Sequence, residues 1–136
     1  MITLTIMFPY YNQPKVLERN LSNILNYPKS IREKLHIIVV DDGSMEYPAL
    51  DVIERMNLES KLLLRLIRID IDIPWNQPEA NNIGIQSAVT EYIFRTDIDH
   101  SFDEENIIKT FNFIEAGLEP STVYFFERKE LINGTL

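Results

Sequence analysis

Two aspartates and a histidine follow an apolar stretch that begins at residue 92. The segment "YIFRTDIDH" ends with Asp97, Asp99 and His100. In an extended strand, residues two apart point to the same side, so both carboxylates could reach one ion. Two like charges this close are unstable without a cation, and hard oxygen ligands favour Mg²⁺ or Mn²⁺, which also bridge diphosphate oxygens. The pair therefore predicts a divalent metal site that lets an acidic surface bind a diphosphate.

The alternative interpretation of this pair is structural. An Asp-x-Asp pair often occurs by chance, and the chain contains another at Asp70 and Asp72. Asp97 and Asp99 could simply end the strand and cap a helix that starts near Asp103. Position favours the metal site, because Asp70 and Asp72 lie among isoleucines at a less defined strand end.

A second acidic turn, "VVDDGS", covers residues 39–44. Asp41 and Asp42 leave an apolar strand, Gly43 permits a tight turn, and Ser44 can hydrogen-bond to the backbone. These residue types are common in strand-to-helix turns, so a structural role is the simpler interpretation of the turn alone. The functional interpretation is that Asp42 accepts hydrogen bonds from a nucleobase N–H or from ribose hydroxyls.

A third motif, "WNQPEANNIGIQSA", covers residues 75–88. Here Asn81, Asn82 and Gly84 are predicted to open a helix whose N-terminus could face an anion. The alternative is an ordinary amphipathic helix preceded by Trp75 as a core or lid aromatic. Without further context the motif favours the ordinary helix.

These motifs are separated by segments that alternate between strand and helix patterns. Apolar, β-branched runs predict five strands, at residues 3–8, 35–40, 62–69, 91–96 and 121–128. Helical periodicity predicts helices between them, at residues 14 to about 25, 48–56, about 80–89 and 103–117. This order predicts an α/β fold, with a mostly parallel, doubly wound sheet, helices on both faces, and strands one, two and four adjacent. Ligands of such sheets bind beyond the carboxyl ends of the strands, so we expect the polar motifs to converge on one site there.

Composition limits the classes of function. The 136 residues fit a single domain, 1–136, and the formal net charge of −8 argues against a nucleic-acid binder. The chain has no cysteine, which excludes disulfides and thiolate metal sites. No apolar run approaches the length of a membrane span and the N-terminus lacks a basic region, so a cytoplasmic protein is the default expectation.

In their order and spacing, the motifs resemble the family 2 glycosyltransferases, inverting enzymes of the Rossmann-like GT-A fold that use nucleotide-diphosphate sugars. The resemblance extends from "TIMFPYYNQ" through "IIVVDDGS" and "NQPEANNIGIQSA" to "YIFRTDIDH". It implies transfer of a sugar from a UDP-type donor to an acceptor hydroxyl, such as that of a glycan, with metal assistance. It also implies that Asp97 and Asp99 bind the metal, and that a base and ribose contact the loop from Pro9 to Tyr11 and Asp42. The residues expected at the nucleotide are Pro9, Tyr11, Asp42, Asn82 and Asp97.

The chain departs from the family pattern in two places. The family commonly has an arginine before the asparagine of the "NNIG" helix, near the diphosphate, where this chain has Asn81. Arg68, Arg95 or the metal could compensate. In the family, the acceptor-binding half and the catalytic base follow the Asp-x-Asp half, and this acceptor half is expected to be missing or minimal here. No residue matches the base, and His100 is a weak candidate for it.

Three functions remain open from the sequence. The first, a metal-dependent glycosyltransferase, is the one we expect. The second is a non-catalytic nucleotide-sugar-binding module that takes its acceptor site from a partner chain, and the third is an interaction domain without chemistry. An exposed apolar flank is expected at "TVYFFE", residues 122–127, and predicts self-association into a homo-oligomer.

Overall fold

The centre of the molecule is a parallel sheet of four strands. The computed structural model describes residues 1–119 and 121–127. Within them, the sheet has the order β3-β2-β1-β4, with strands β1 Leu4–Tyr10, β2 Leu35–Asp41, β3 Leu63–Arg68 and β4 Tyr92–Arg95. The two central strands are apolar and almost wholly buried, as expected where both faces of a parallel sheet are covered. The predicted adjacency of strands one, two and four is confirmed.

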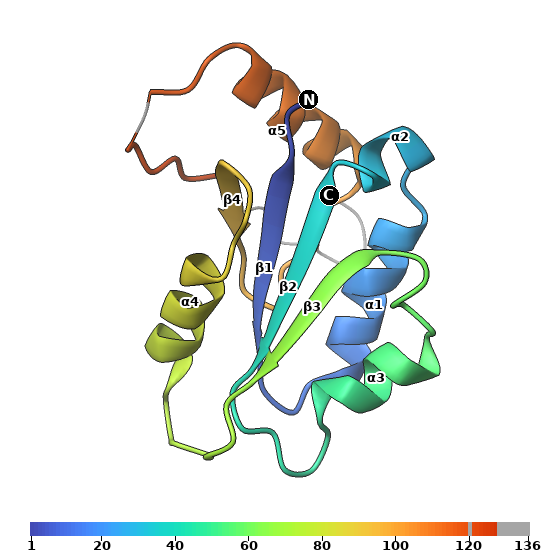
Figure 1. Cartoon of the computed structure of the whole chain (residues 1–136), viewed down its shortest axis with the longest axis vertical. Coiled ribbons are helices and arrows are strands. Elements are labelled where there is room, and N and C mark those ends of the chain that lie inside the picture. The colour runs from blue at the N-terminus through green and yellow to red at the C-terminus, as the bar shows by residue number, and fades with distance from the viewer. Residues whose placement is uncertain (120, 128–136) are drawn as a thin grey trace.

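Helices cover both faces of this sheet, as predicted. They are α1 Pro14–Leu25, α2 Lys29–Arg32, α3 Ala49–Arg55, α4 Gln77–Gln86 and α5 Glu104–Glu115. In Figure 1, α4 lies alone on one side of the sheet and α1, α3 and α5 lie on the other. The larger core cluster joins one face of the sheet to α1, α3 and α5, whereas a smaller cluster joins the other face to α4. The short helix α2 was not predicted.

Helix α4 begins three residues earlier than predicted. Pro78 lies in its first turn, where a proline costs no helical hydrogen bond. The "NNIG" residues therefore lie inside the helix and do not open it, which corrects the prediction from the sequence. Gly84 is needed for packing, because a Cβ there would lie 2.6 Å from Cγ of Met7 on β1.

The fifth strand, predicted at 121–128, is not formed over residues 121–127; residue 128 lies outside the described residues. The segment contacts the rest of the molecule through its aromatic rings, since Phe126 packs edge-on against Phe94 and Tyr124 against Phe113. It forms no ladder with the short strand β4 among the described residues. Val123 and Phe125 are exposed, as the predicted apolar flank requires.

Among the described residues, no helix is both long and apolar enough to cross a membrane.

Candidate nucleotide and metal site

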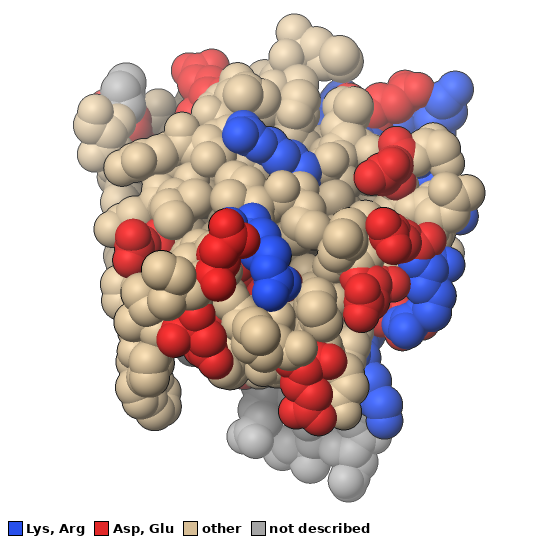
Figure 2. Space-filling view, turned by 60° about the horizontal axis from the view of Figure 1, so that its bottom comes forward, with Lys and Arg blue, Asp and Glu red and all other residues tan. Residues whose placement is uncertain are grey.

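The loops after β2 and β3 lie at the carboxyl ends of these strands, at the bottom of Figure 1, and hydrogen bonds connect them with the turn after β4. Figure 2 brings this edge forward and shows many acidic side chains around it, with a few basic side chains among them. Two consecutive residues at the start of α4 connect two of the motifs directly. Asn76 donates a hydrogen bond to Oδ1 of Asp42 over 3.0 Å, and Gln77 donates one to Oδ1 of Asp97 over 3.2 Å. The structure thus brings Asp42 and Asp97 to the same edge, at the N-terminus of α4.

The two predicted metal residues, Asp97 and Asp99, form a compact cluster with His100. One donor atom each from Asp97, Asp99 and His100 can be chosen so that all three lie within 4.8 Å of one another. On an octahedral Mg²⁺ with ligands at about 2.1 Å, adjacent donors lie about 3.0 Å apart and opposite donors about 4.2 Å apart. The three side chains would therefore have to draw closer together than they lie here to hold one ion, and two carboxylates suit a hard cation.

Loop geometry brings the two carboxylates together, so the argument from strand alternation was wrong. Strand β4 ends at Arg95, before either aspartate. Asp97 and Asp99 lie in the following turn, in which the His100 N–H donates to the Asp97 carbonyl over 3.1 Å. A turn with an internal hydrogen bond fixes the spacing of the carboxylates in place of a ladder.

Helix α1 holds this turn from behind. The side-chain amide of Asn20, which is 3% exposed, donates to the Ile98 carbonyl over 2.7 Å. Arg19 donates to the Asp99 carbonyl over 3.0 Å. Sequence reasoning missed both residues, although one signal was present: Asn20 is a polar residue on the apolar face defined by Leu17 and other residues of α1.

Asp97 is also the partner of an arginine. Nη2 of Arg95 lies 3.0 Å from Oδ1 of Asp97, and Nε of the same guanidinium donates to Oδ1 of Asn81 over 3.2 Å. Asn81 occupies the position where the family pattern has an arginine. The guanidinium of Arg95 therefore connects Asn81 with Asp97, a predicted metal ligand.

The two aspartates of the "VVDDGS" turn have different environments. Asp41 is 1% exposed and accepts hydrogen bonds from the backbone N–H groups of Ser44 and Ala49. Because the residue before α3 is Pro48, with no side-chain cap, Asp41 caps the first turn of that helix from the neighbouring strand. Asp42 is also buried, at 8% exposure, but its Oδ1 accepts from the side-chain amide of Asn76 and not from the backbone.

Gly43 adopts a φ of +75°, and a Cβ there would lie 2.8 Å from the Asp72 Cα, so only glycine fits against the loop after β3. Asp72 in turn accepts a hydrogen bond from the Tyr11 hydroxyl over 3.0 Å, which raises the pKa of the Tyr11 phenol. Of the other residues expected at the nucleotide, Pro9 is buried within β1 and Asn82 is exposed on α4. Tyr11 and Asn82 are thus accessible for binding.

Trp75 precedes the two amides that bind the site carboxylates. It is 97% exposed and adopts a φ of +60°. Its placement in the core, one of the two roles considered from the sequence, is wrong. The side chain is held at the surface beside Asn76, whose amide contacts Asp42.

Comparison with known families identifies the chain. The family model described as Glycosyl transferase family 2 matches residues 5–130. This chain belongs to glycosyl transferase family 2. None of the curated protein sequences gives a significant match.

Solved glycosyltransferases share the fold of this family 2 chain. TarS 1-349 of S. aureus in complex with UDP-GlcNAc is similar with a TM-score of 0.68 and 22% identity, over 85% of this chain and 32% of that one. The mannosyltransferase PcManGT from Pyrobaculum calidifontis, in complex with GDP-Man and Mn²⁺, is similar with a TM-score of 0.67 and 24% identity, over 87% of this chain and 33% of that one. The family 2 chain spans about a third of the length of these proteins.

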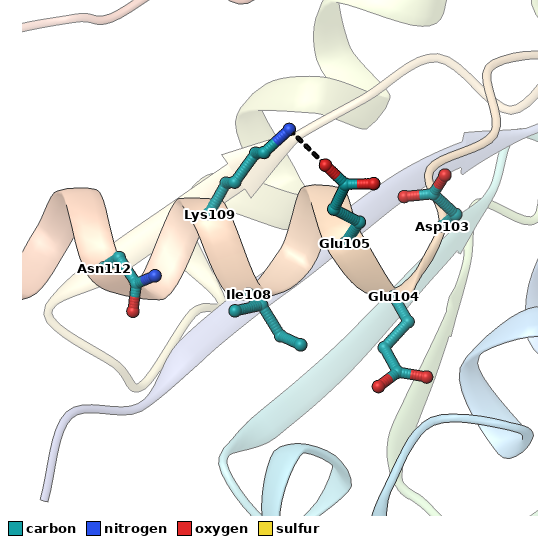
Figure 3. Close-up of a pocket in the computed structure, with 6 residues that line it drawn as sticks. All are labelled: Asp103, Glu104, Glu105, Ile108, Lys109 and Asn112. Atoms are coloured by element: carbon teal, nitrogen blue, oxygen red, sulfur yellow. Dashed lines mark ion pairs between the residues drawn. The ribbon is translucent and has the colours of Figure 1, made fainter.

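A shallow depression elsewhere on the family 2 chain has no relation to these motifs. Figure 3 shows it at the start of α5, where Lys109 pairs with Glu105. It is lined by Asp103, Glu104, Glu105, Ile108, Lys109 and Asn112. Each of these side chains comes from α5 or the residue before it, so this depression does not combine residues from several loops. Several loops do meet at the carboxyl edge of the sheet, and we therefore place the candidate site there.

Proposed function

We propose that residues 1–136 form a single nucleotide-sugar-binding domain that transfers a sugar from a UDP-type donor to an acceptor hydroxyl. The observation that carries the proposal is the link from Asp42 through Asn76 and Gln77 to Asp97, beside the donor atoms of Asp99. Asp42, which is proposed to bind the nucleoside, and Asp97, which is proposed to bind the metal, are thus linked through two consecutive residues at one edge of the sheet. The bound UDP-GlcNAc of TarS and the bound GDP-Man and Mn²⁺ of PcManGT support a nucleotide sugar as the ligand class.

In this proposal, different residues bind different parts of the donor. Asp42 accepts hydrogen bonds from the nucleoside, in place of the amide of Asn76, and the exposed Tyr11 contacts the base, with Pro9 shaping the loop below it. Asn82 lies on the exposed side of α4, where the donor would pass. Asp97 and Asp99 hold a divalent cation, Mn²⁺ or Mg²⁺, which when bound stabilises the negative charge of the departing diphosphate.

His100 has two roles open to it at this site. Its Nε2 lies 3.9 Å from Oδ1 of Asp99, and it belongs to the cluster that could hold the ion. An imidazole bound to a metal through this nitrogen cannot accept a proton from an acceptor hydroxyl at the same atom. We therefore assign His100 to the metal and not to the base.

The alternative is a module that binds the nucleotide sugar and takes its acceptor site from a partner chain, including a second copy of itself. One observation favours it: the apolar side chains of Val123 and Phe125 are exposed and offer a surface for a partner chain. Measuring UDP release from UDP-sugars with and without acceptor glycans distinguishes the two functions. Tight binding without transfer would support the module.

Calorimetry of UDP and GDP, with Mn²⁺ or with chelator, tests the site itself. Metal and nucleotide each relieve the repulsion that the other meets, so we expect Mn²⁺ to strengthen UDP binding roughly tenfold or more. Asp99→Asn should remove most of this dependence, because it keeps an oxygen ligand but loses the charge. Asp42→Ala should weaken UDP binding about tenfold and preserve the metal dependence.

The matched control for Asp99→Asn is Asp70→Asn, at an exposed aspartate of the other Asp-x-Asp pair. It should change neither the affinity for UDP nor its dependence on Mn²⁺. Equal UDP binding in Mn²⁺ and in chelator would contradict the metal role of Asp97 and Asp99.

A further inference from the structure

The site just described is short of positive charge. The chain has a net charge of −8, and Asp42, Asp97 and Asp99 meet at the edge where a diphosphate would bind. A nucleoside diphosphate carries several negative charges, and one divalent ion shared with two carboxylates leaves most of them uncompensated. Asn81 is neutral, so a cation must come from another element of the fold. Arg68 and Arg95 end the strands β3 and β4 at this edge.

Arg68 is already used by the fold. Its Nη1 lies 3.3 Å from Oδ2 of the buried Asp41, and its Nη2 donates to the Ser44 carbonyl over 2.9 Å. Moving this guanidinium to a ligand would leave a buried carboxylate without its cation, which is strongly unfavourable. Arg68 therefore stabilises the turn after β2 and is not available to a diphosphate.

Arg95 has the opposite character. It pairs in register with Met7, which packs in the cluster formed with Ala80 of α4, so Arg95 leaves the sheet on the side covered by α4. Its side chain is 42% exposed, and its ion pair with Asp97 is a surface pair, a kind that adds little to folding stability. The contacts to Asn81 and Asp97 use Nε and Nη2 of a guanidinium that offers five N–H donors.

We propose that Arg95 binds the diphosphate of the donor and that Asn81 orients its guanidinium for this contact. The inference rests on the proposed function and adds a residue to it. When the Asp97 carboxylate binds the cation, its negative charge is shared and its hold on Arg95 weakens. The planar guanidinium then donates to phosphate oxygens, for which its paired N–H groups are well matched, while the side-chain oxygen of Asn81 keeps Nε in place.

Calorimetry in Mn²⁺ with uridine, UMP, UDP and inorganic pyrophosphate tests this role. Arg95→Gln should weaken binding of UDP and of pyrophosphate by about 10- to 100-fold, as expected for loss of hydrogen bonds to a charged group. Uridine affinity should stay unchanged. Arg95→Lys should bind UDP more tightly than Arg95→Gln but less tightly than the wild type, because a single ammonium charge replaces the planar guanidinium and its paired N–H groups.

Arg65→Gln is the matched control. Arg65 is an exposed strand arginine that pairs with Ile38, a residue of the same α4 cluster, so it lies on the same face of the sheet. It sits on β3, about 14 Å from β4 at three strand spacings. It loses the same charge, and UDP affinity should change by less than about twofold.

Exchanging the two residues gives a second, charge-neutral test. In the double variant Asn81→Arg with Arg95→Asn, the guanidinium and the amide are exchanged across an existing 3.2 Å contact. UDP affinity should return to within about fivefold of the wild type, whereas Arg95→Asn alone should behave like Arg95→Gln.

The outcomes separate this inference from the function on which it rests. If neither UDP nor GDP binds the wild-type chain in Mn²⁺, the proposed function and the role of Arg95 both fail. If UDP binds the wild type and Arg95→Gln equally, or if Arg95→Gln weakens uridine as much as UDP, only the role of Arg95 is overturned. A loss of UDP and pyrophosphate binding with uridine unchanged supports it.

Discussion

Two acidic residues lie at the end of β2 and two follow β4, yet their carboxylates have opposite environments. At the end of β2, the carboxylate of Asp41 is buried and accepts from two backbone N–H groups and from Arg68. After β4, the carboxylate of Asp99 is 72% exposed, and the backbone of its turn is held instead, by Asn20 and Arg19. The charge of Asp41 stabilises the fold, whereas the charge of Asp99 stays at the surface.

This difference gives a criterion that residue type alone does not provide. A carboxylate whose oxygens are all occupied by the protein cannot bind an ion without breaking the structure that surrounds it. A carboxylate held through the carbonyls of its loop is positioned but still available. By this criterion Asp41 is structural and Asp99 is available for metal binding, although each belongs to an acidic pair at the carboxyl end of a strand.

The largest expected effect is the difference in folding stability between Asp41→Asn and Asp99→Asn, which replace one aspartate in each turn. Asp41→Asn leaves Arg68 without its anion and puts amide hydrogens towards the N–H groups of Ser44 and Ala49, so we expect a loss of about 3 kcal/mol in the free energy of unfolding. Asp99→Asn should change this free energy by less than about 0.5 kcal/mol. Urea denaturation measures both variants. Similar losses for the two would break the distinction between the turns.

The support behind the second turn predicts an intermediate effect. Asn20→Leu removes the donor to the Ile98 carbonyl and should cost about 1–3 kcal/mol of folding stability. If Asn20 is only structural, this loss of stability is the whole effect. If Asn20 also positions the turn, the folded variant should lose at least fivefold in Mn²⁺ affinity, because the carboxylates of Asp97 and Asp99 lose their fixed spacing. Calorimetric titration with Mn²⁺, below the unfolding temperature, measures the second quantity.

Asn23→Leu is the control for this prediction. Asn23 lies on the same helix and is half-buried, so the substitution makes the same chemical change away from the turn. Its Mn²⁺ affinity should equal that of the wild type. Equal Mn²⁺ affinities in Asn20→Leu and Asn23→Leu would show that α1 does not position the metal carboxylates.

Sequence patterns predicted the framework of the fold because its signals are strong and local. The strands β1 and β2 are apolar runs bounded by turn residues, and Pro14 begins α1 as expected. The parallel order follows from alternation of strands and helices, and it placed Asp42 and Asp97 at one edge correctly. The strand predicted at 121–128 fails over its described residues because an apolar run does not specify a partner strand, and here the rings of Tyr124 and Phe126 pack against Phe113 and Phe94.

The details of the candidate site depended on contacts between residues far apart in the sequence. Neither the pairing of Asn76 with Asp42 nor that of Asn20 with the Ile98 carbonyl has a local pattern, since the partners are 34 and 78 residues apart. The choice between Arg68 and Arg95 as a diphosphate partner was likewise open in the sequence. It depends on which guanidinium faces a buried carboxylate, and burial at a strand end follows from tertiary packing.

The last prediction uses Tyr10 as a probe of the buried turn. Tyr10 pairs in register with Asp41, is 1% exposed, and donates to the Tyr47 carbonyl over 2.6 Å. Burial, and next the charge of Asp41, raises the pKa of Tyr10 from 10.0 to about 12. The folded state therefore keeps the Tyr10 proton at a pH where the unfolded chain has lost it. The free energy of unfolding should fall as pH rises from about 10 to about 12, by up to about 1.4 kcal/mol per unit.

Tyr10→Phe should reduce this alkaline slope, at a cost of about 1 kcal/mol at neutral pH for the lost hydrogen bond. Part of the slope should remain, because burial also raises the pKa of Tyr27. Urea denaturation at pH 9, 10 and 11 gives the slopes for the two chains. Tyr47→Phe is the comparison variant: the Tyr47 side chain is 47% exposed and its pKa is raised by a hydrogen bond with Glu46, so its removal should change the slope less than Tyr10→Phe does. Identical slopes in the wild type and Tyr10→Phe would mean that Tyr10 does not sense the buried charge of Asp41, and the contrast between the two acidic turns would then rest on stability alone.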